Sequence, residues 1–380
     1  MFVCKMPKAA YCGPDALGQL KALCSGAKRA AVFSDRGIER SGVLEKPLAL
    51  IREAGVEASL LLDLPAEPTR DQAQAVVDAF RASGADMIIA IGGGSVMDIA
   101  KLCSILASGE STVADLLANP AIGKKTVRSI IIPTTAGTGA EATPNAIVLV
   151  PEKELKVGIV CEEMIPDAVI LDGEMIRRLP AHIAASTGVD ALCHAIECYT
   201  SKKATPFSNL YAMEALKLIF ANIEAACLDP EALESKSAML LAAYYAGVAI
   251  TCSGTTAVHA LSYPLGGKYH IPHGVANAMM LMPVMRFNVS FCQKELAQVY
   301  DALGQQGAQD EAAKAQWMLE RMEALVQTLQ IPTDLKQYGV AMEDLDGLVA
   351  AGMDVQRLLV NNKRPVTAED ARALYLELLQ

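Results

Sequence analysis

Histidine, tryptophan and charged residues are scarce in this chain of 380 residues, which has five histidines, one tryptophan and 20% charged residues. Its 33 basic residues are outnumbered by 43 acidic ones, and the formal net charge is -10. No basic stripe is available to displace counterions from phosphates, so we expect no nucleic-acid partner and instead a small-molecule substrate. Hydrophobic residues make up 52% of the chain, which is ample for a folded core.

Targeting signals and cysteine-rich metal motifs are missing as well. Ten cysteines are scattered between Cys4 and Cys292 without a C-x-x-C pair, which argues against a zinc ribbon or a redox dithiol. Residues 1–15 lack the charged and apolar regions of a secretory signal. The longest apolar run, 238–250, would span roughly 20 Å as a helix, less than a bilayer core requires. We therefore expect a cytoplasmic protein with reduced thiols and no membrane partner.

The two halves of the chain differ in pattern, and its length favours two domains. The first half alternates helical periodicity, as at 71–83, with short apolar runs at 29–34, 58–62, 86–91, 129–132 and 168–171. This alternation predicts a mainly parallel sheet with helices on both faces. Beyond about residue 178 the patterns are helical, at 181–200, 206–227, 231–252, 255–263, 275–288, 292–304, 309–329 and 366–379. We expect an α/β domain, 1–178, and an all-helical domain, 179–380, packed across a ligand-binding cleft.

A glycine-rich loop joins the predicted strand at 86–91 to a helix. It consists of Gly92, Gly93, Gly94 and Ser95. Glycines at such a turn let the backbone approach a pyrophosphate, which the N–H groups of the helix N-terminus stabilise. The loop is no P-loop, because no Gly-Lys-Ser/Thr follows, and Met97 stands where a G-x-G-x-x-G motif has its third glycine. The alternative is a tight structural turn.

Hydroxyl groups and one carboxylate add to the case for a nucleotide. The segment 133–143 is rich in hydroxyls that can bind phosphate, ribose or carboxamide, namely those of Thr134, Thr135, Thr138 and Thr143. Asp35 directly follows the first predicted strand, where a carboxylate accepts hydrogen bonds from ribose and repels a 2′-phosphate. The pattern therefore favours NAD over NADP, although Asp35 is equally suited to cap a helix.

Three of the five histidines and one aspartate have the spacing of metal ligands. Asp190 and His194 are four residues apart, so both lie on one face of the predicted helix 181–200. His259 lies in the predicted helix 255–263. His273 follows this helix after an expected Pro-Leu-Gly-Gly turn. One carboxylate and three imidazoles suit divalent iron or zinc and leave coordination positions open for a substrate. Each residue alone is more easily explained as part of the core.

Four segments together resemble a known family. GGGSVMDIAK, PTTAGTGAEAT, DALCHAIECY and VHALSYPLGGKYHIPHGVANA occur in the order and spacing of the iron-containing (group III) alcohol dehydrogenases, over roughly residues 1–380. The resemblance implies a dinucleotide-binding domain followed by a helical domain, as in dehydroquinate synthase, and a divalent metal between them. It also implies NAD(H)-dependent oxidation of an alcohol or reduction of an aldehyde, with Fe²⁺ or Zn²⁺ polarising the substrate oxygen for hydride transfer, in a homodimer or larger homo-oligomer.

The resemblance also assigns residues. By position the metal ligands are Asp190, His194, His259 and His273. The pyrophosphate loop is formed by Gly92, Gly93, Gly94 and Ser95, and Asp98 is the acid that follows it. The other cofactor neighbours are Thr134, Thr135, Thr138, Thr143, Lys156 and Leu179. Asp35 matches the residue associated with a preference for NAD.

Two aromatic side chains near the expected metal site depart from the family pattern. Many members have a further histidine where this chain has Tyr263, one helical turn after His259. Tyr263 is therefore a candidate for the substrate pocket, with simple packing as the alternative. His270 is often a different residue in the family, and it is either a wall of the pocket or an exposed loop residue. His182 is expected on the surface of a helix.

The sequence thus predicts a metal-dependent NAD(H) oxidoreductase for a small primary alcohol, a diol or a functionalised aldehyde. One alternative within the same fold is a zinc-dependent polyol or sugar-phosphate dehydrogenase or lyase. That alternative is less favoured, because the metal-bearing segments supply only Lys268 for a phosphate. The other alternative is a non-catalytic sensor of NAD or metal.

Overall fold

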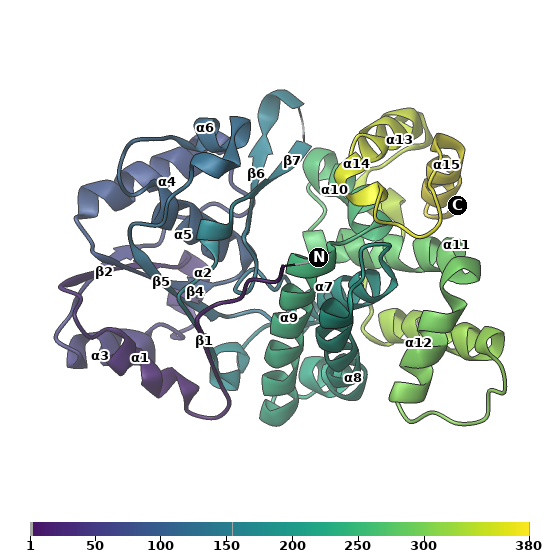
Figure 1. Cartoon of the computed structure of the whole chain (residues 1–380), viewed down its shortest axis with the longest axis horizontal. Helices are drawn as coiled ribbons and strands as arrows, with labels where there is room; N and C mark the ends of the chain where they lie inside the picture. The colour runs from purple at the N-terminus through teal and green to yellow at the C-terminus, as the bar shows by residue number, and fades with distance from the viewer. Residues whose placement is uncertain (1–2, 154, 380) are drawn as a thin grey trace. The chain divides into compact units, whose positions relative to one another are not determined.

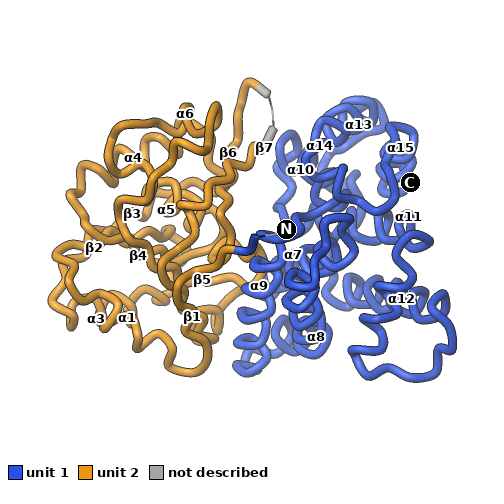
Figure 2. Tube along the Cα trace, in the orientation of Figure 1, with its two compact units in different colours: residues 1–4, 180–380 blue, residues 5–179 orange. Residues whose placement is uncertain are grey.

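The computed structural model describes residues 3–153 and 155–379, and these form two compact units (Figure 2). One unit contains residues 5–179 and is an α/β structure. The other contains residues 180–379 together with residues 3–4. In its described residues every regular element is a helix. These characters confirm the fold class that the two sequence patterns predict.

The first unit is built on a six-stranded sheet in which every pair of neighbouring strands is parallel. The strand order is β1-β8-β5-β4-β2-β3. Figure 1 labels four of these strands, β1, β5, β4 and β2. Its strands are β1 (Ala9–Cys12), β2 (Arg29–Phe33), β3 (Glu57–Leu61), β4 (Met87–Gly92), β5 (Arg128–Pro133) and β8 (Ala168–Leu171). The strands β6 (Asn145–Val150) and β7 (Leu155–Val160) form a separate antiparallel hairpin.

The central strands are apolar throughout because both faces of the sheet are covered. In β4, Ile88 and Ala90 belong to one hydrophobic cluster, whereas Met87, Ile89 and Ile91 belong to the cluster on the opposite face. The first cluster includes residues of α4 (Arg70–Ser83), α5 (Gly94–Leu106) and α6 (Val113–Ala118). The second includes residues of α1 (Gln19–Leu23) and α3 (Glu45–Glu53). The short helix α2 (Arg36–Arg40) follows β2.

Helix α5 carries a buried ion pair into the core of this unit. Lys101 is fully buried, and its Nζ lies 3.0 Å from Asp98 Oδ1 one turn earlier. Nζ also donates to the carbonyl oxygen of Ala140 at 2.9 Å and to Thr143 at 3.3 Å. Asp98 in turn accepts from the backbone N–H of Ile147 in β6 at 2.9 Å. This network joins α5 to the segment that follows β5 and to the hairpin.

The helical unit is arranged around a buried central helix, α7, which packs against α8, α9, α10 and α11. The bounds are α7 (Ala181–Thr200), α8 (Pro206–Leu228), α9 (Leu233–Ser253), α10 (Ala257–Tyr269), α11 (His273–Ala302), α12 (Glu311–Thr328), α13 (Leu345–Met353), α14 (Gln356–Leu359) and α15 (Ala368–Glu377). The chain bends by 106° between α9 and α10, at Gly254, whose φ is +71°. Glycine suits this bend because a side chain strains such a backbone.

Two details of this unit differ from the sequence prediction. Helix α10 continues through Pro264 to Tyr269, so the expected Pro-Leu-Gly-Gly turn is wrong, and the chain turns at His270 instead. Proline removes one backbone hydrogen bond, which a buried helix held by tertiary contacts tolerates. Residues 275–288 and 292–304 are predicted as two helices, and in the structure α11 consists of two helical segments that meet at a kink at Cys292, whose backbone is not helical. Helices α13 and α14 were not predicted.

Helix α11 is the one helix in the described residues that is long and apolar enough to cross a membrane by length and composition. The bent pair α9 and α10 meets the same criterion only if both helices are taken together. Most of the apolar part of α11 is buried inside the protein, as in the core helix of a helical bundle.

Lys101→Met should lower the free energy of unfolding by about 3–5 kcal/mol, because it leaves the buried carboxylate of Asp98 without its cation. Urea unfolding followed by circular dichroism measures the change. The matched control is Lys217→Met, which breaks an exposed ion pair with Glu214 and should cost less than about 1 kcal/mol. Equal losses in the two variants would contradict a special contribution of the buried pair.

Candidate functional site

The glycine loop ends β4 and begins α5, as predicted. Gly93 occupies the N-cap position of α5, where no side chain caps the helix. The N–H groups of its first turn therefore point to an anion-binding position. A Cβ on Gly94 would lie 2.9 Å from Thr138 Cγ2, so glycine is needed where this loop meets the threonine-rich segment after β5. The backbone N–H of Thr134 binds the carbonyl oxygen of Gly92 at 3.0 Å, which holds the two loops together.

A cavity of about 1020 Å³ connects this loop with Asp35. Its lining includes Asp35, Gly93, Gly94 and Ser95, together with the segment 60–66 after the start of β3. The volume is in the upper range for ligand pockets. The structure thus places two separately predicted parts of a nucleotide site on one cavity within the α/β unit.

Asp35 caps a helix and also lines the cavity. It is the N-cap of α2, where its Oδ1 accepts from the N–H groups of Gly37 at 2.7 Å and Ile38 at 2.9 Å. Its Oδ2 makes no such bond among the described residues, and Asp35 is one of the residues that line the cavity. The neighbouring Arg36 is held in a bidentate pair by Asp63, with N–O distances of 2.9 and 3.0 Å.

Three other residues predicted to contact the cofactor form hydrogen bonds or ion pairs with other groups of the protein. Asp98 belongs to the Lys101 network described above, and burial raises its pKa although Lys101 opposes the shift. Lys156 Nζ lies 2.5 Å from Glu67 Oε1. Leu179 is partly buried at the end of the unit, where its N–H binds the Ile176 carbonyl. None of these three lines the cavity beside Asp35, and their contact with a cofactor stays a prediction.

One buried acid in the threonine-rich segment was not predicted. Glu141 is 1% exposed, and its Oε1 has no hydrogen-bond partner among the described residues. Burial raises its pKa to about 7, against smaller opposite effects from the backbone N–H of Glu141 itself and then from Lys101. The sequence offers no signal for this, because a glutamate in a loop of threonines and glycines is ordinarily exposed.

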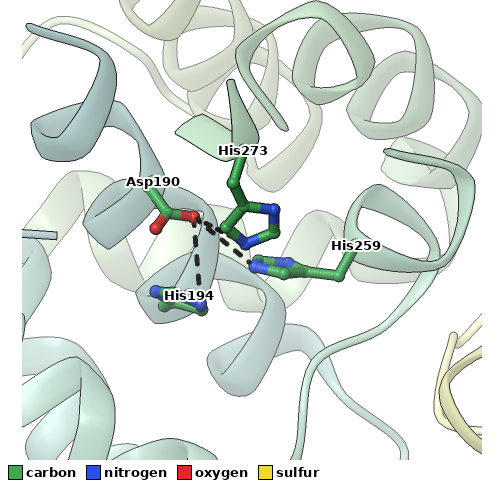
Figure 3. A group of neighbouring side chains, drawn as sticks. All are labelled: Asp190, His194, His259 and His273. Carbon is green, nitrogen blue, oxygen red and sulfur yellow. Dashed lines mark ion pairs between the residues drawn. The ribbon is translucent and has the colours of Figure 1, made fainter. Parts of the chain in front are cut away.

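In the helical unit, the four predicted metal ligands converge from three helices (Figure 3). Asp190 and His194 project from consecutive turns of α7, His259 comes from α10, and His273 is the first residue of α11. Asp190 Oδ1 lies 3.9 Å from Nε2 of His194, 3.6 Å from that of His259 and 3.7 Å from that of His273. One ligand atom from each residue lies within 4.8 Å of all the others.

These separations fit a divalent metal ion. Two ligands bound at about 2.1 Å with a tetrahedral angle lie about 3.4 Å apart, close to the distances found. The set of one carboxylate oxygen and three imidazole nitrogens suits iron or zinc. The side chains of Asp190, His194 and His259 are almost completely buried, whereas His273 is 31% exposed. An approaching substrate therefore meets the site on the His273 side.

The electrostatics of the cluster favour a positive charge. Burial raises the pKa of Asp190, but attraction to His194, His273 and His259 outweighs it and leaves this pKa well below its usual range. Burial lowers the pKa of His259, but the carboxylates of Glu197 and Asp190 raise it to about 10. Either protons or a divalent cation can supply the charge, and metal binding requires the neutral imidazoles.

Two polar residues beside the ligands escaped the sequence prediction. Glu197 lies on α7 one turn beyond His194 and contacts the ring of His259. Asn277 lies on α11 one turn beyond His273, and its Nδ2 donates to Asp190 Oδ1 at 2.7 Å. Both are fully buried. Their spacing from the ligands, three and four residues, is the only signal the sequence gives.

Tyr263, His270 and His182 differ in their burial and in their distance from the metal cluster. Tyr263 is buried on α10, with its ring centroid 6.0 Å from that of His273 and its hydroxyl 3.5 Å from Arg357 Nη2. His270 is exposed and ends α10 in the left-handed conformation, with φ 55°. His182 is exposed on α7, and neither His182 nor His270 belongs to the metal cluster.

Comparison with known proteins covers both units. The sequence pattern described as iron-containing alcohol dehydrogenase matches residues 7–173, and that of the C-terminal part of the Fe-containing alcohol dehydrogenase family matches residues 184–379. The chain belongs to the iron-containing alcohol dehydrogenase family. It is therefore a metal-containing alcohol dehydrogenase, an oxidoreductase, and its helical unit contains a group of four side chains that could hold a metal ion.

Individual relatives match this alcohol dehydrogenase over nearly its whole length. It is 33% identical to long-chain-alcohol dehydrogenase 1 of Geobacillus thermodenitrificans (strain NG80-2), over 97% of this chain and 94% of that protein. It is 32% identical to the NAD-dependent methanol dehydrogenase of Bacillus methanolicus, over 91% of each chain. A crystal structure of 1,3-propanediol oxidoreductase superposes with a TM-score of 0.93 at 29% identity and covers 100% of both chains.

Gly274→Ala should weaken metal binding in this alcohol dehydrogenase. A Cβ at this position would lie 2.3 Å from the backbone oxygen of Ser186 in α7, so α11 must shift and carry His273 away from Asp190. We expect less bound metal and a loss of about 1–3 kcal/mol in unfolding free energy. Elemental analysis after dialysis and denaturant unfolding measure the two effects.

The matched control is Gly347→Ala in α13, where an added Cβ meets nothing within 4 Å. It should keep the metal and be neutral or slightly stabilising. Full metal content in the Gly274→Ala protein would show that α11 need not contact α7 this closely to place His273.

Proposed function

We propose that the chain is an NAD(H)-dependent alcohol dehydrogenase or aldehyde reductase that uses a divalent metal, Fe²⁺ first and Zn²⁺ second. The main support for the metal is that Asp190 Oδ1 lies 3.6–3.9 Å from the Nε2 atoms of three histidines. A bound divalent ion supplies a Lewis acid that polarises the oxygen of an alcohol or aldehyde. Membership of the family supports iron, and the NAD-dependent methanol dehydrogenase among its relatives supports NAD(H).

The side chains of the site hold and orient the reactants. Asp190, His194, His259 and His273 bind the ion on buried helices, so their geometry is fixed before substrate arrives. The uncapped N-terminus of α5 binds the cofactor pyrophosphate, and Asp35 accepts from a ribose hydroxyl. A bound nicotinamide would supply or accept the hydride at the substrate carbon, so no protein nucleophile is needed.

The surroundings of His273 favour a small alcohol, diol or functionalised aldehyde. Tyr263 and Arg357 place a phenol and a cation near the exposed side of the cluster, where they can bind a second polar group of the substrate. A sugar phosphate is less favoured, because Lys268 already pairs with Asp344 at 2.8 Å. A cytoplasmic location and a homodimer or larger homo-oligomer complete the proposal, and both rest on the resemblance to the family.

Metal removal tests the proposed chemistry. Treatment with a chelator should abolish NADH oxidation at 340 nm with a panel of short aldehydes, diol-derived aldehydes and acidic aldehydes, and Fe²⁺ or Zn²⁺ should restore it. His273→Ala should lower both bound metal, measured by elemental analysis, and activity. Absence of turnover with every aldehyde after either metal is restored would contradict the dehydrogenase. Full metal occupancy in the variant would exclude His273 as a ligand.

Asp35 tests the cofactor preference. Asp35→Asn keeps a side-chain oxygen for the α2 cap but removes the charge, so the ratio of kcat/KM for NADPH to that for NADH should rise. A charge about 4 Å from the 2′-phosphate costs at least about 1 kcal/mol even in water, which corresponds to about fivefold. Asp35→Gly should raise the ratio as well while loosening α2. A wild-type enzyme that prefers NADPH would contradict this placement of Asp35.

A further inference from the structure

Glu197 links the start of helix α10 to one of the metal ligands. It lies on α7, seven residues after Asp190 and so on the same face, and its side chain is 1% exposed. Its two carboxylate oxygens have different partners. Oε1 binds the backbone at the start of α10, and Oε2 contacts Nδ1 of His259.

Oε1 caps α10 from outside that helix. It accepts from the N–H of Thr256 at 2.9 Å, from the hydroxyl of Thr256 at 2.7 Å and from the N–H of Val258 at 2.9 Å. The N–H of His259 adds a longer bond of 3.4 Å. Thr256 is the N-cap residue, but its side chain makes no capping bond of its own. Glu197 therefore satisfies the free N–H groups of α10 and places a negative charge at its positive end.

Oε2 determines which nitrogen of His259 is available. An ionised carboxylate only accepts hydrogen bonds, so Nδ1 of His259 carries the proton. Nε2 then presents its lone pair, and this is the atom 3.6 Å from Asp190 Oδ1 in the metal cluster. A carboxylate behind a ligating imidazole fixes the tautomer and the ring orientation.

We propose that Glu197 is a positioning residue that holds His259 in its metal-binding tautomer and fixes the start of α10 with the same carboxylate. The contact of Oε2 with Nδ1 is the part of this arrangement that reaches the metal cluster, whereas Oε1 serves the helix. The inference rests on the proposed function insofar as the cluster binds a divalent metal. It adds to that function a dependence of metal affinity on a residue that touches neither metal nor substrate.

Glu197→Gln separates the two tasks of the carboxylate. Four donors converge on Oε1, so they select the amide oxygen of Gln for that position, and its NH₂ group then faces His259. The amide donates to Nδ1, which moves the imidazole proton to Nε2 and removes the lone pair from the metal. The cap is retained. We expect the affinity for Co²⁺ to fall about 10- to 100-fold with little change in the denaturation midpoint of the metal-free protein.

The measurement uses the full-length metal-free protein and Co²⁺ as the probe. Competition with a chromophoric chelator gives the affinity, and the visible spectrum of bound Co²⁺ reports the coordination. Thr256→Val removes one donor to Oε1 but leaves the contact of Oε2 with His259, so it should lower the denaturation midpoint and keep the Co²⁺ affinity within about twofold. Asp172→Asn is the control for a buried capping carboxylate in the α/β unit rather than in the helical unit that contains the cluster. Asp172 accepts from the N–H groups of Leu17 at 3.0 Å and Glu174 at 3.1 Å without contacting a histidine.

The outcomes are distinct. Wild-type Co²⁺ affinity in Glu197→Gln would overturn the inference and leave Glu197 as a helix cap alone. An equal loss in Thr256→Val would also overturn it, because the effect would then come from displacement of α10. If Glu197→Gln does not fold, Glu197→Asp, which is one methylene too short to serve both partners, should show the loss of affinity, and unchanged affinity there would be decisive against the role. Wild-type protein that binds no Co²⁺ would instead contradict the proposed metal function, and this inference with it.

Discussion

The buried carboxylate of Asp190 is the constraint on which the helical unit depends. A carboxylate removed from water requires partners of opposite charge or strong hydrogen-bond donors. Here the imidazoles of three histidines and the amide of Asn277 surround it, and they come from α7, α10 and α11. These helices must pack closely enough to bring those groups within 4 Å, and Gly274 permits the approach of α11 to α7. The close packing of these helices and the geometry of the candidate metal site therefore depend on each other.

The α/β unit places a different feature at the end of its buried central strand β4, namely the uncapped backbone N–H groups that begin α5. Glycines replace side chains where the loop before α5 meets the threonine-rich segment, and the buried Lys101 ties that segment to α5 through its carbonyl groups. An uncharged core would hold the helix equally well by apolar contacts. The lysine makes the arrangement of the segment around α5 more specific, because each N–H of its ammonium group requires an acceptor in a defined position.

Features that depend on neighbouring residues in the sequence are predicted correctly, whereas features that depend on tertiary contacts are not. The central strands were predicted because burial on both faces makes them continuous apolar runs, whereas β1 was missed because it is a four-residue edge strand with alternating exposure. The turn expected at Pro264 is wrong, because the local tendency of proline and glycine yields to the tertiary contacts of α10. The ligand cluster was found because Asp190 and His194 share one helix face and histidines are rare in this chain.

By itself the sequence determined the division into an α/β and a helical part, the position of the glycine loop and the identity of the four side chains that converge at the candidate metal site. These follow from periodicity, glycine content and the small number of residue types that bind metals. Only the tertiary structure decided which neighbours support them. Glu197 and His259 are 62 residues apart, and the contact exists because α10 begins against α7. Glutamates are common on helices, so its burial beside a ligand depends on how distant helices pack, which no local pattern records.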